Sequence, residues 1–266
     1  MRGVRIEPGT RAIVTGASRG IGRATARSLA ERGARVGLLS RSEDDLASLA
    51  EELGGGAVVL PADCADRDSV GAAVRGFVNE TGGLEILVAN AGVAHYAPFT
   101  ELPVDKAEEM VSVNLLGTLY TAKAALPHML DRATGHVVVV ASGASLRAFP
   151  WAATYGATKS AQAAFAEALR HELSGTGVSV STVFPGEIAT DLHAHERDRM
   201  PDWYRGDDAI PPERVAEGVV RAVEEDRRAV YVPAIVRALG INGLAPRLAD
   251  RILATLRGRT AAPRRD

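Results

Sequence analysis

The sequence contains little that would crosslink the chain, anchor it in a membrane or charge it strongly. Among its 266 residues Cys64 is the only cysteine, so an intrachain disulfide and a cysteine-based metal site are both excluded. We therefore expect no bound metal and a reducing, cytoplasmic environment. The first eleven residues have no apolar run typical of a signal peptide, and runs such as 137–141 are too short to span a bilayer. A net charge of −2 provides no overall field that would attract nucleic acid.

What the chain does contain is typical of one globular domain. Hydrophobic residues make up 46% and charged residues 24% of the sequence, and the length suits a single α/β domain with a large core. The charge is uneven, because the residues from Arg227 onward contain nine arginines against two aspartates. That segment carries about +7 and the rest of the chain about −9.

Strand and helix patterns alternate along most of the chain. We predict strands at 12–15, 35–40, 57–60, 85–89, 136–141, 178–184 and 229–232, and helices at 20–32, 43–53, 67–80, 104–130 and 152–173. Pro127 should end or kink the fourth helix, and residues 189–212 have an irregular, charged pattern. Four consecutive valines at 137–140 indicate a strand buried on both faces of a parallel sheet. The alternation predicts βαβ units in a doubly wound fold, with ligands at the carboxyl ends of the strands.

A glycine-rich turn follows the first predicted strand. Gly16, Gly20 and Gly22 allow a tight turn and close approach of the backbone to a pyrophosphate, and the N-terminus of the next helix offers free N–H groups. Ser18, Arg19 and Ile21 lie between the glycines. The spacing is G-x3-G-x-G rather than G-x-G-x-x-G, and a turn without a ligand is the alternative.

The end of the second strand discriminates between cofactors. NAD-binding enzymes usually place Asp or Glu there for the ribose 2′-hydroxyl, whereas this chain has Ser40 followed by Arg41. A guanidinium group pairs with a 2′-phosphate that a carboxylate would repel, and Arg19 is a second cation placed for it. The residues therefore favour NADP(H) over NAD(H), unless both arginines are only solvated surface groups.

Tyr155 and Lys159 are four residues apart, which places them on one face of the predicted helix. An ammonium group near a phenol favours the phenolate, lowering a pKa that is otherwise about 10. Such a tyrosine can exchange a proton with a carbonyl oxygen. This spacing is common by chance, but Ser142 follows the fifth strand, where a hydroxyl can hold the substrate oxygen, and Asn114 lies in the preceding helix.

Together these motifs resemble the short-chain dehydrogenase/reductase family in its compact, NADP(H)-preferring form, from Thr15 to Thr190. The resemblance implies a three-layer Rossmann fold over residues 1–266, with a cofactor half at about 10–95, a catalytic half at about 96–233 and a basic helical tail at about 234–266. It implies a catalytic set of Asn114, Ser142, Tyr155 and Lys159. The implied cofactor-binding set is Gly16, Ser18, Arg19, Gly20, Ile21, Gly22, Ser40, Arg41, Asp63, Cys64, Asn90, Ala91, Gly92, Tyr155, Lys159, Pro185, Gly186, Ile188 and Thr190. Ala89 departs from the family, many of whose members have a second Asn there.

The resemblance also implies roles for these residues. Tyr155 would be the acid/base, Lys159 would lower its pKa and bind the nicotinamide ribose, and Ser142 would orient the substrate oxygen. Asn114 would hold a water linking Lys159 to solvent, and Asp63 would bind the adenine amino group. The implied activity is reduction of a ketone or aldehyde by a homodimer or homotetramer. The alternatives are a non-catalytic NADP(H)-binding redox sensor of the same fold, and an epimerase or dehydratase that uses the same Tyr and Lys.

Two regions would shape the substrate side. Candidate pocket residues are His95, Tyr96, Ser145, Leu146, Phe149, Trp151 and Glu187, with Met200, Trp203 and Tyr204 in a substrate lid. Their aromatic character favours an apolar or bulky substrate, unless they only pack the lid. The tail, 234–266, indicates one or two amphipathic helices broken near 240–246. It could lie on an anionic membrane, but covering the cleft or a subunit interface is the interpretation that we favour.

Overall fold

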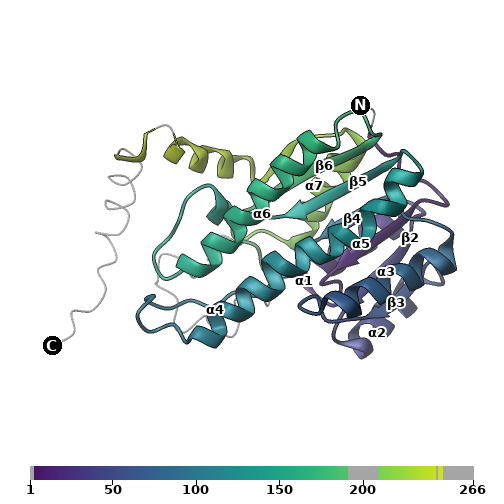
Figure 1. The fold of residues 1–266 in the computed structure, drawn as a ribbon, viewed down its shortest axis with the longest axis horizontal. Helices are drawn as coiled ribbons and strands as arrows, with labels where there is room; N and C mark the ends of the chain where they lie inside the picture. Colours follow the sequence, from purple (N-terminus) through teal and green to yellow (C-terminus); the bar gives the residue numbers. More distant parts are fainter. Residues whose placement is uncertain (1–2, 191–208, 244, 248–266) are drawn as a thin grey trace.

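One parallel sheet organises the computed structural model, which describes residues 3–190, 209–243 and 245–247. Its order is β3-β2-β1-β4-β5-β6-β7, as Figure 1 shows. The strands are β1 (Arg11–Thr15), β2 (Arg35–Ser40), β3 (Ala57–Pro61), β4 (Ile86–Ala89), β5 (Gly135–Val140), β6 (Val178–Pro185) and β7 (Ala229–Val232). Every residue of β5 is buried, so the prediction from its four valines is confirmed.

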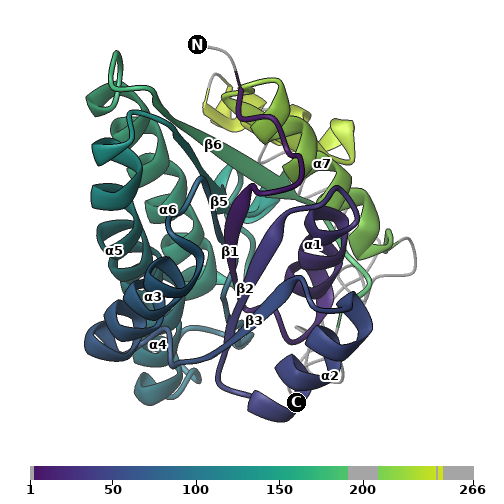
Figure 2. The ribbon, with the colours of Figure 1, turned by 90° about the vertical axis from the view of Figure 1, so that its right-hand side faces the viewer.

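Helices cover both faces of the sheet (Figure 2). One layer contains α1 (Gly20–Ala30), α2 (Glu43–Leu53) and α7 (Pro212–Glu224). The other contains α3 (Arg67–Thr81), α4 (Val104–Met110), α5 (Gly117–Asp131) and α6 (Ala153–Glu172). Successive strand residues point to opposite faces, so Val14 packs in one apolar cluster and Ile13 in the other. This is the predicted three-layer Rossmann fold. None of the helices among the described residues is long and apolar enough to cross a membrane.

Helix α7 was not among the predicted elements. Pro212 stands at its first position, where a missing N–H is harmless and the fixed φ suits a helix. Val215, Val219 and Val223 recur every four residues and are buried, so the signal was present in the sequence. We instead predicted an irregular segment up to Pro212 and left the following residues unassigned.

The predicted helix over 104–130 has three parts. A π-helical segment, Val111–Leu116, separates α4 from α5. Pro127 does not end the helix, which continues through it to Asp131. In the tail, Ala234–Gly243 forms a 3₁₀ helix, η5, which ends within the segment 240–246 where the break was predicted. Residues 248–266 lie outside the described part of the chain.

The strand order places the point of reversal between β1 and β4. The chain builds outward from β1 to β3 on one side and from β4 to β7 on the other. Their crossover connections therefore leave in opposite directions and open a crevice at the carboxyl ends of these two strands, where ligands bind in such folds. The glycine-rich turn after β1 and Asn90 after β4 both lie at this crevice.

A buried histidine lies at the opposite end of the sheet. The His136 side chain in β5 is fully buried, and its Nε2 atom lies 2.7 Å from the Ser181 hydroxyl on β6. That hydroxyl donates to the Arg227 carbonyl, so the imidazole nitrogen facing it carries the proton. No described residue bonds to the other ring nitrogen, Nδ1. Burial lowers the pKa of His136 to about 4, so the ring is neutral at physiological pH.

This histidine should make folding sensitive to moderate acid. Its pKa is about 6.5 in an unfolded chain and about 4 in the fold, so below pH 6.5 the unfolded state binds more protons. The neutral ring's contribution is complete above pH 6.5 and decreases by about 3 kcal/mol as the pH falls to 4. We expect His136→Gln to show a shallower fall in urea-derived unfolding free energy between pH 7 and 5. The exposed His171→Gln is the control. Identical profiles for wild type and His136→Gln would contradict this account.

Candidate active site

A hydrogen-bonded clamp joins the ends of β1 and β4. The Thr15 side-chain oxygen accepts hydrogen bonds of 2.9 Å from the backbone N–H groups of both Asn90 and Ala91. The Asn90 side-chain amide donates to the Thr15 carbonyl at 2.9 Å. These bonds use the polar groups of Asn90 and Ala91 to hold the glycine-rich loop open. Sequence reasoning placed Thr15 in the loop motif but gave it no role.

The glycine-rich loop leaves room for a ligand rather than for side chains. Gly16 and Gly20 have φ of +66° and +55°, which favour glycine. A Cβ atom on Gly22 would lie 2.0 Å from the Gly16 carbonyl oxygen. Helix α1 begins with no side-chain cap and no acidic residue in its first turn. Its N–H groups and positive dipole end are therefore available to an anion.

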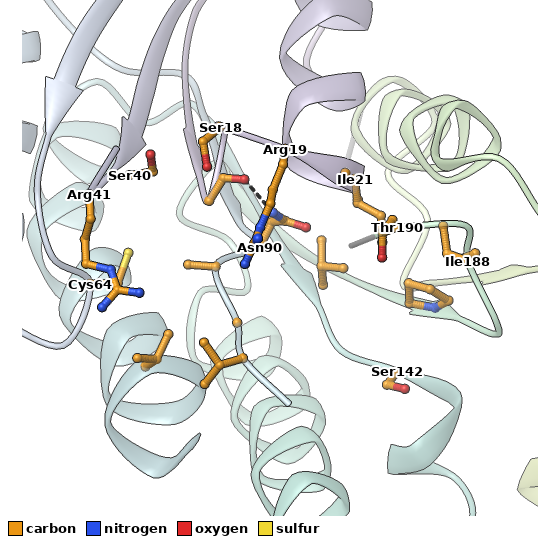
Figure 3. A pocket seen from close by; sticks show the side chains of 18 of the residues that line it. Ser18, Arg19, Ile21, Ser40, Arg41, Cys64, Asn90, Ser142, Ile188 and Thr190 are labelled. Atoms are coloured by element: carbon orange, nitrogen blue, oxygen red, sulfur yellow. Dashed lines mark hydrogen bonds between the residues drawn. The ribbon is translucent and has the colours of Figure 1, made fainter. Parts of the chain in front are cut away.

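The residues predicted to determine the preference between NADP(H) and NAD(H) lie at the end of β2. The Ser40 hydroxyl is buried and has no partner among the described residues, and Arg41 beside it is exposed. In Figure 3 Arg41 lies beside Cys64, whereas Arg19 extends across the middle of the pocket toward Asn90. The structure adds Asp45, whose carboxylate accepts from the Ser42 hydroxyl at 2.6 Å and which also lines the pocket.

Asp63 and Cys64 form the adjacent wall after β3. One Asp63 carboxylate oxygen accepts from the Ala65 N–H at 2.9 Å, which fixes the turn. Burial, with a smaller contribution from the Asp63 charge, raises the pKa of the Cys64 thiol to about 12. The thiol therefore stays protonated and is not a nucleophile.

Tyr155 and Lys159 lie together on α6, as the four-residue spacing predicted. Their side chains are 5% and 4% exposed, and the Lys159 ammonium lies 5.9 Å from the centre of the Tyr155 ring. Lys159 Nζ donates to the Val140 carbonyl at 3.0 Å. Burial lowers the pKa of Lys159 to about 7. The lysine can therefore gain or lose a proton near neutral pH, unlike an exposed lysine.

Ser142 lies at the other end of the pocket from Ser40 and Arg41 (Figure 3). It follows β5 and caps a short 3₁₀ helix, Gly143–Ser145. Its side-chain oxygen accepts from the Ala144 N–H at 3.1 Å, so its own O–H hydrogen remains available to a substrate oxygen.

Asn114 is fully buried behind the pocket wall, in the π-helical segment. Its side chain exchanges two hydrogen bonds with the backbone of Val93, at 2.8 and 3.0 Å, and donates to the Thr158 hydroxyl at 3.1 Å. Its backbone carbonyl accepts from Gln162 and Thr118 side chains, both at 2.8 Å. Asn114 therefore ties the loop after β4 to α6. Thr158 and Gln162 were not identified from the sequence.

One cavity of about 300 Å³ brings the predicted cofactor residues together. All of them line it except Gly22, which supports the loop from behind; of the catalytic set, only Asn114 does not line it. The cavity includes Pro185, Gly186, Ile188 and Thr190 after β6. The lining also contains Ser42, Asp45, Ala62, Val93, Val113, Val140 and Ala141, which were not predicted. Most of these adjoin predicted residues at strand ends, a position that could have identified them.

The predicted substrate-side residues lie outside that lining. Tyr96 is buried against Tyr155, with ring centroids 5.9 Å apart. His95 Nε2 lies 3.1 Å from the Glu109 carboxylate, which also accepts from Lys106 at 3.0 Å. Hydrogen bonding by Lys106 holds the pKa of Glu109 below its usual value. The predicted lid residues Met200, Trp203 and Tyr204 fall outside the described residues.

Comparisons with known proteins place this geometry in a family. Residues 10–201 match the short chain dehydrogenase family. The chain belongs to that family. It is 36% identical to the uncharacterized oxidoreductase SAR2567 of Staphylococcus aureus, over 81% of this chain and 91% of that one. A Burkholderia phymatum short chain dehydrogenase/reductase, solved with NAD, superposes with a TM-score of 0.84 at 25% identity, covering 92% and 97% of the two chains.

A second solved structure gives the same assignment. The 3-ketoacyl-(acyl-carrier-protein) reductase of Brucella melitensis, solved with NADH, has a TM-score of 0.77 at 27% identity, with 85% of this chain and 97% of that chain covered. The protein is thus a short-chain dehydrogenase/reductase, with the fold that binds nicotinamide nucleotides in this family. The observed glycine cradle and the unpartnered Ser40 hydroxyl fit such a cofactor.

Gly22→Ala should weaken nucleotide binding. The new methyl group would lie 2.0 Å from the Gly16 carbonyl oxygen and displace the loop from the helix N-terminus. We expect the Kd for NADPH, measured by nicotinamide fluorescence, to rise roughly tenfold or more. Gly76→Ala is the matched control, because a Cβ there meets nothing within 4 Å and the substitution favours helix by up to about 1 kcal/mol. Unchanged NADPH affinity in a folded Gly22→Ala protein would contradict the assigned cradle.

Proposed function

We propose that the protein is an NADP(H)-dependent oxidoreductase that interconverts a ketone or aldehyde and the corresponding alcohol. The main support is the convergence of Ser142, Tyr155 and Lys159 on the cavity that also contains the glycine-rich loop. The three come from segments up to 17 residues apart in sequence, yet all of them line one crevice. Such convergence is what proton transfer to a bound carbonyl requires.

In this proposal the glycine-rich loop and the residues after β2 and β6 would hold the nicotinamide nucleotide, which would supply the hydride for the carbonyl carbon or take it up in the reverse direction. Tyr155 donates its phenolic proton to the carbonyl oxygen, so that the C=O π bond becomes a C–H and an O–H bond. The Ser142 hydroxyl donates a hydrogen bond to the same oxygen and orients it. Lys159, whose pKa burial has lowered to about 7, then returns a proton toward the Tyr155 oxygen.

Asn114 acts in this scheme as a positioning residue. Its bonds to Val93 and Thr158 set the distance between the loop after β4 and the helix that carries Tyr155. A Cβ on Gly92 would lie 3.3 Å from Asn114 Oδ1 and 3.6 Å from Lys159 Nζ. The missing side chain of Gly92 thus leaves space between these two groups, and we propose that the water inferred from the family resemblance binds there.

The preference for NADP(H) is supported by the end of β2. No carboxylate occupies the position of Ser40, and Arg41 beside it lies at the same end of the cavity. Arg19 lies nearer the middle, so Arg41 is the better placed of the two for a 2′-phosphate. The buried, unpartnered Ser40 hydroxyl supplies a neutral donor beside it.

The substrate proposal depends on the surroundings of Tyr155. Its ring belongs to an apolar cluster with Tyr96, Met110 and Ala152, and Phe149 packs against it. These side chains favour an apolar or bulky carbonyl compound. A homodimer or homotetramer remains our prediction from the family, and a cytoplasmic location remains our prediction from the single cysteine.

Tyr155→Phe should remove turnover without removing cofactor binding. The substitution deletes the acid/base but keeps the ring that packs against Tyr96. We expect a loss of about 10²- to 10⁴-fold in kcat in a screen of ketones and aldehydes with NADPH, with Kd for NADPH changed little. Tyr120→Phe, on α5, removes a hydroxyl outside the site and should be fully active. Full carbonyl reductase activity in Tyr155→Phe would rule out the proposed proton transfer.

Ser40→Asp combined with Arg41→Ala should reverse the cofactor preference. The new carboxylate would repel a 2′-phosphate and accept from a 2′-hydroxyl, and the guanidinium group would be lost. We expect the ratio of kcat/KM for NADPH over NADH to fall by roughly 100-fold. Arg19→Ala, measured in parallel, separates the contributions of the two arginines. A double variant whose KM for NADPH does not change would show that the 2′-phosphate is bound elsewhere.

A further inference from the structure

Helix η5 (Ala234–Gly243) has three distinct sides. Residues three apart in a 3₁₀ helix lie on one side, so Val236, Leu239 and Asn242 form the first. This side packs on the loop that carries Ser142: Cβ positions on Gly143 would lie 3.3 Å from Val236 and 3.2 Å from Leu239. Asn242 accepts a hydrogen bond from Arg147. This side covers the loop that carries Ser142.

The second side is apolar and open to solvent. It consists of Ile235, Ala238 and Ile241, with Ile235 74% exposed and Ile241 49% exposed. Exposed large hydrophobic side chains are few among the described residues, and η5 alone carries two of them on one side. Covering a catalytic loop needs only the first side of the helix. Contacts within the described fold therefore do not explain why large apolar side chains are exposed on the second side.

The third side meets a groove lined by arginines. Arg237 of η5, Arg214 and Arg221 of α7, and Arg227 before β7 line one open cavity of about 440 Å³. No carboxylate is among the residues that line it. Arg214 lies 4.0 Å from Glu217 and Arg227 pairs with Glu225, whereas neither Arg221 nor Arg237 has an ion pair with a described residue. The groove therefore offers two uncompensated guanidinium groups beside the apolar stripe of η5.

These features together indicate an occupant that is both apolar and anionic. A second copy of the chain that paired this surface with itself would bring the arginines of both copies into one interface, and the groove contains no carboxylate to compensate them. A phosphate ion alone would leave Ile235 and Ile241 exposed. Guanidinium groups bind phosphate oxygens in bidentate fashion, and isoleucines beside them can enter the headgroup region of a bilayer.

We propose that the apolar stripe of η5 and the adjoining arginine groove form a docking surface for an anionic phospholipid membrane. Ile235 and Ile241 insert among the headgroups while Arg221 and Arg237 bind lipid phosphates. The surface is separate from the cofactor cavity and shares no lining residue with it. Because η5 also packs on the Ser142 loop, docking would occur beside the catalytic cleft.

The test is flotation of the full-length protein with vesicles, without substrate or cofactor. We expect binding to vesicles containing phosphatidylglycerol and little binding to pure phosphatidylcholine. Arg221→Gln/Arg237→Gln should lower the partition coefficient roughly tenfold or more, and Ile235→Ser/Ile241→Ser should lower it by a similar factor. The controls are Arg5→Gln/Arg67→Gln and Phe99→Ser/Val104→Ser, which remove exposed side chains of the same kinds elsewhere. Circular dichroism and nucleotide binding confirm that each variant is folded.

Several results would overturn the proposal. Absence of binding to anionic vesicles would do so, and so would equal binding to both lipid compositions. Wild-type binding that both η5 and groove variants retain would assign the contact to another part of the chain. A concentration-dependent dimer in gel filtration that Ile235→Ser/Ile241→Ser abolishes, without vesicle binding, would make the stripe a subunit interface. None of these outcomes bears on the proposed oxidoreductase activity, because the measurement requires no turnover.

Discussion

The clamp between Thr15 and Asn90 is the contact on which the rest of the site depends. In a parallel sheet whose order reverses, β1 and β4 are neighbours, but the loops that follow them leave in opposite directions. Those loops would expose unpaired backbone N–H groups at their closest approach. The Thr15 side-chain oxygen accepts hydrogen bonds from two of these N–H groups, and the Asn90 side-chain amide donates to the Thr15 carbonyl. The polar groups nearest the crevice are thereby satisfied without filling it.

A second set of buried hydrogen bonds extends this order to the catalytic helix. The loop that begins at Asn90 reaches Val93, whose backbone pairs with the Asn114 side chain, and Asn114 bonds to Thr158 on α6. Tyr155 and Lys159 lie within one turn of Thr158. The π-helical segment matters here because it holds an asparagine at full burial with every polar atom bonded. A chain of direct contacts thus connects the glycine-rich loop with the side chains proposed to transfer the proton.

The sequence was informative where a local pattern determines the structure. The alternation of strands and helices, the glycine cradle after β1 and the pairing of Tyr155 with Lys159 follow from periodicity, turn chemistry and helical spacing. Other features depend on tertiary partners that no local pattern contains. The π-helical segment exists because Asn114 bonds to groups 21 and 44 residues away. The exposed side of η5 is defined only once its other side packs on Gly143. Helix α7 was not predicted, although its valine repeat is visible in the sequence. That omission was an error of interpretation, because the information was present.

The buried polar groups of the crevice also show why such a site has to be supported by the surrounding fold. Lys159 is almost fully buried with one neutral acceptor, and the Ser40 hydroxyl has no described partner. Groups in this condition reduce the stability of the free protein. In the proposed function a bound nucleotide would offer oxygen atoms to both groups, so binding would recover part of that free energy. The apolar clusters on both faces of the sheet provide the stability that offsets the cost of burying these incompletely bonded groups. His136 is also buried and is neutral, but it lies at the opposite end of the sheet and lines neither of the two cavities described above. We therefore expect it to affect folding rather than chemistry.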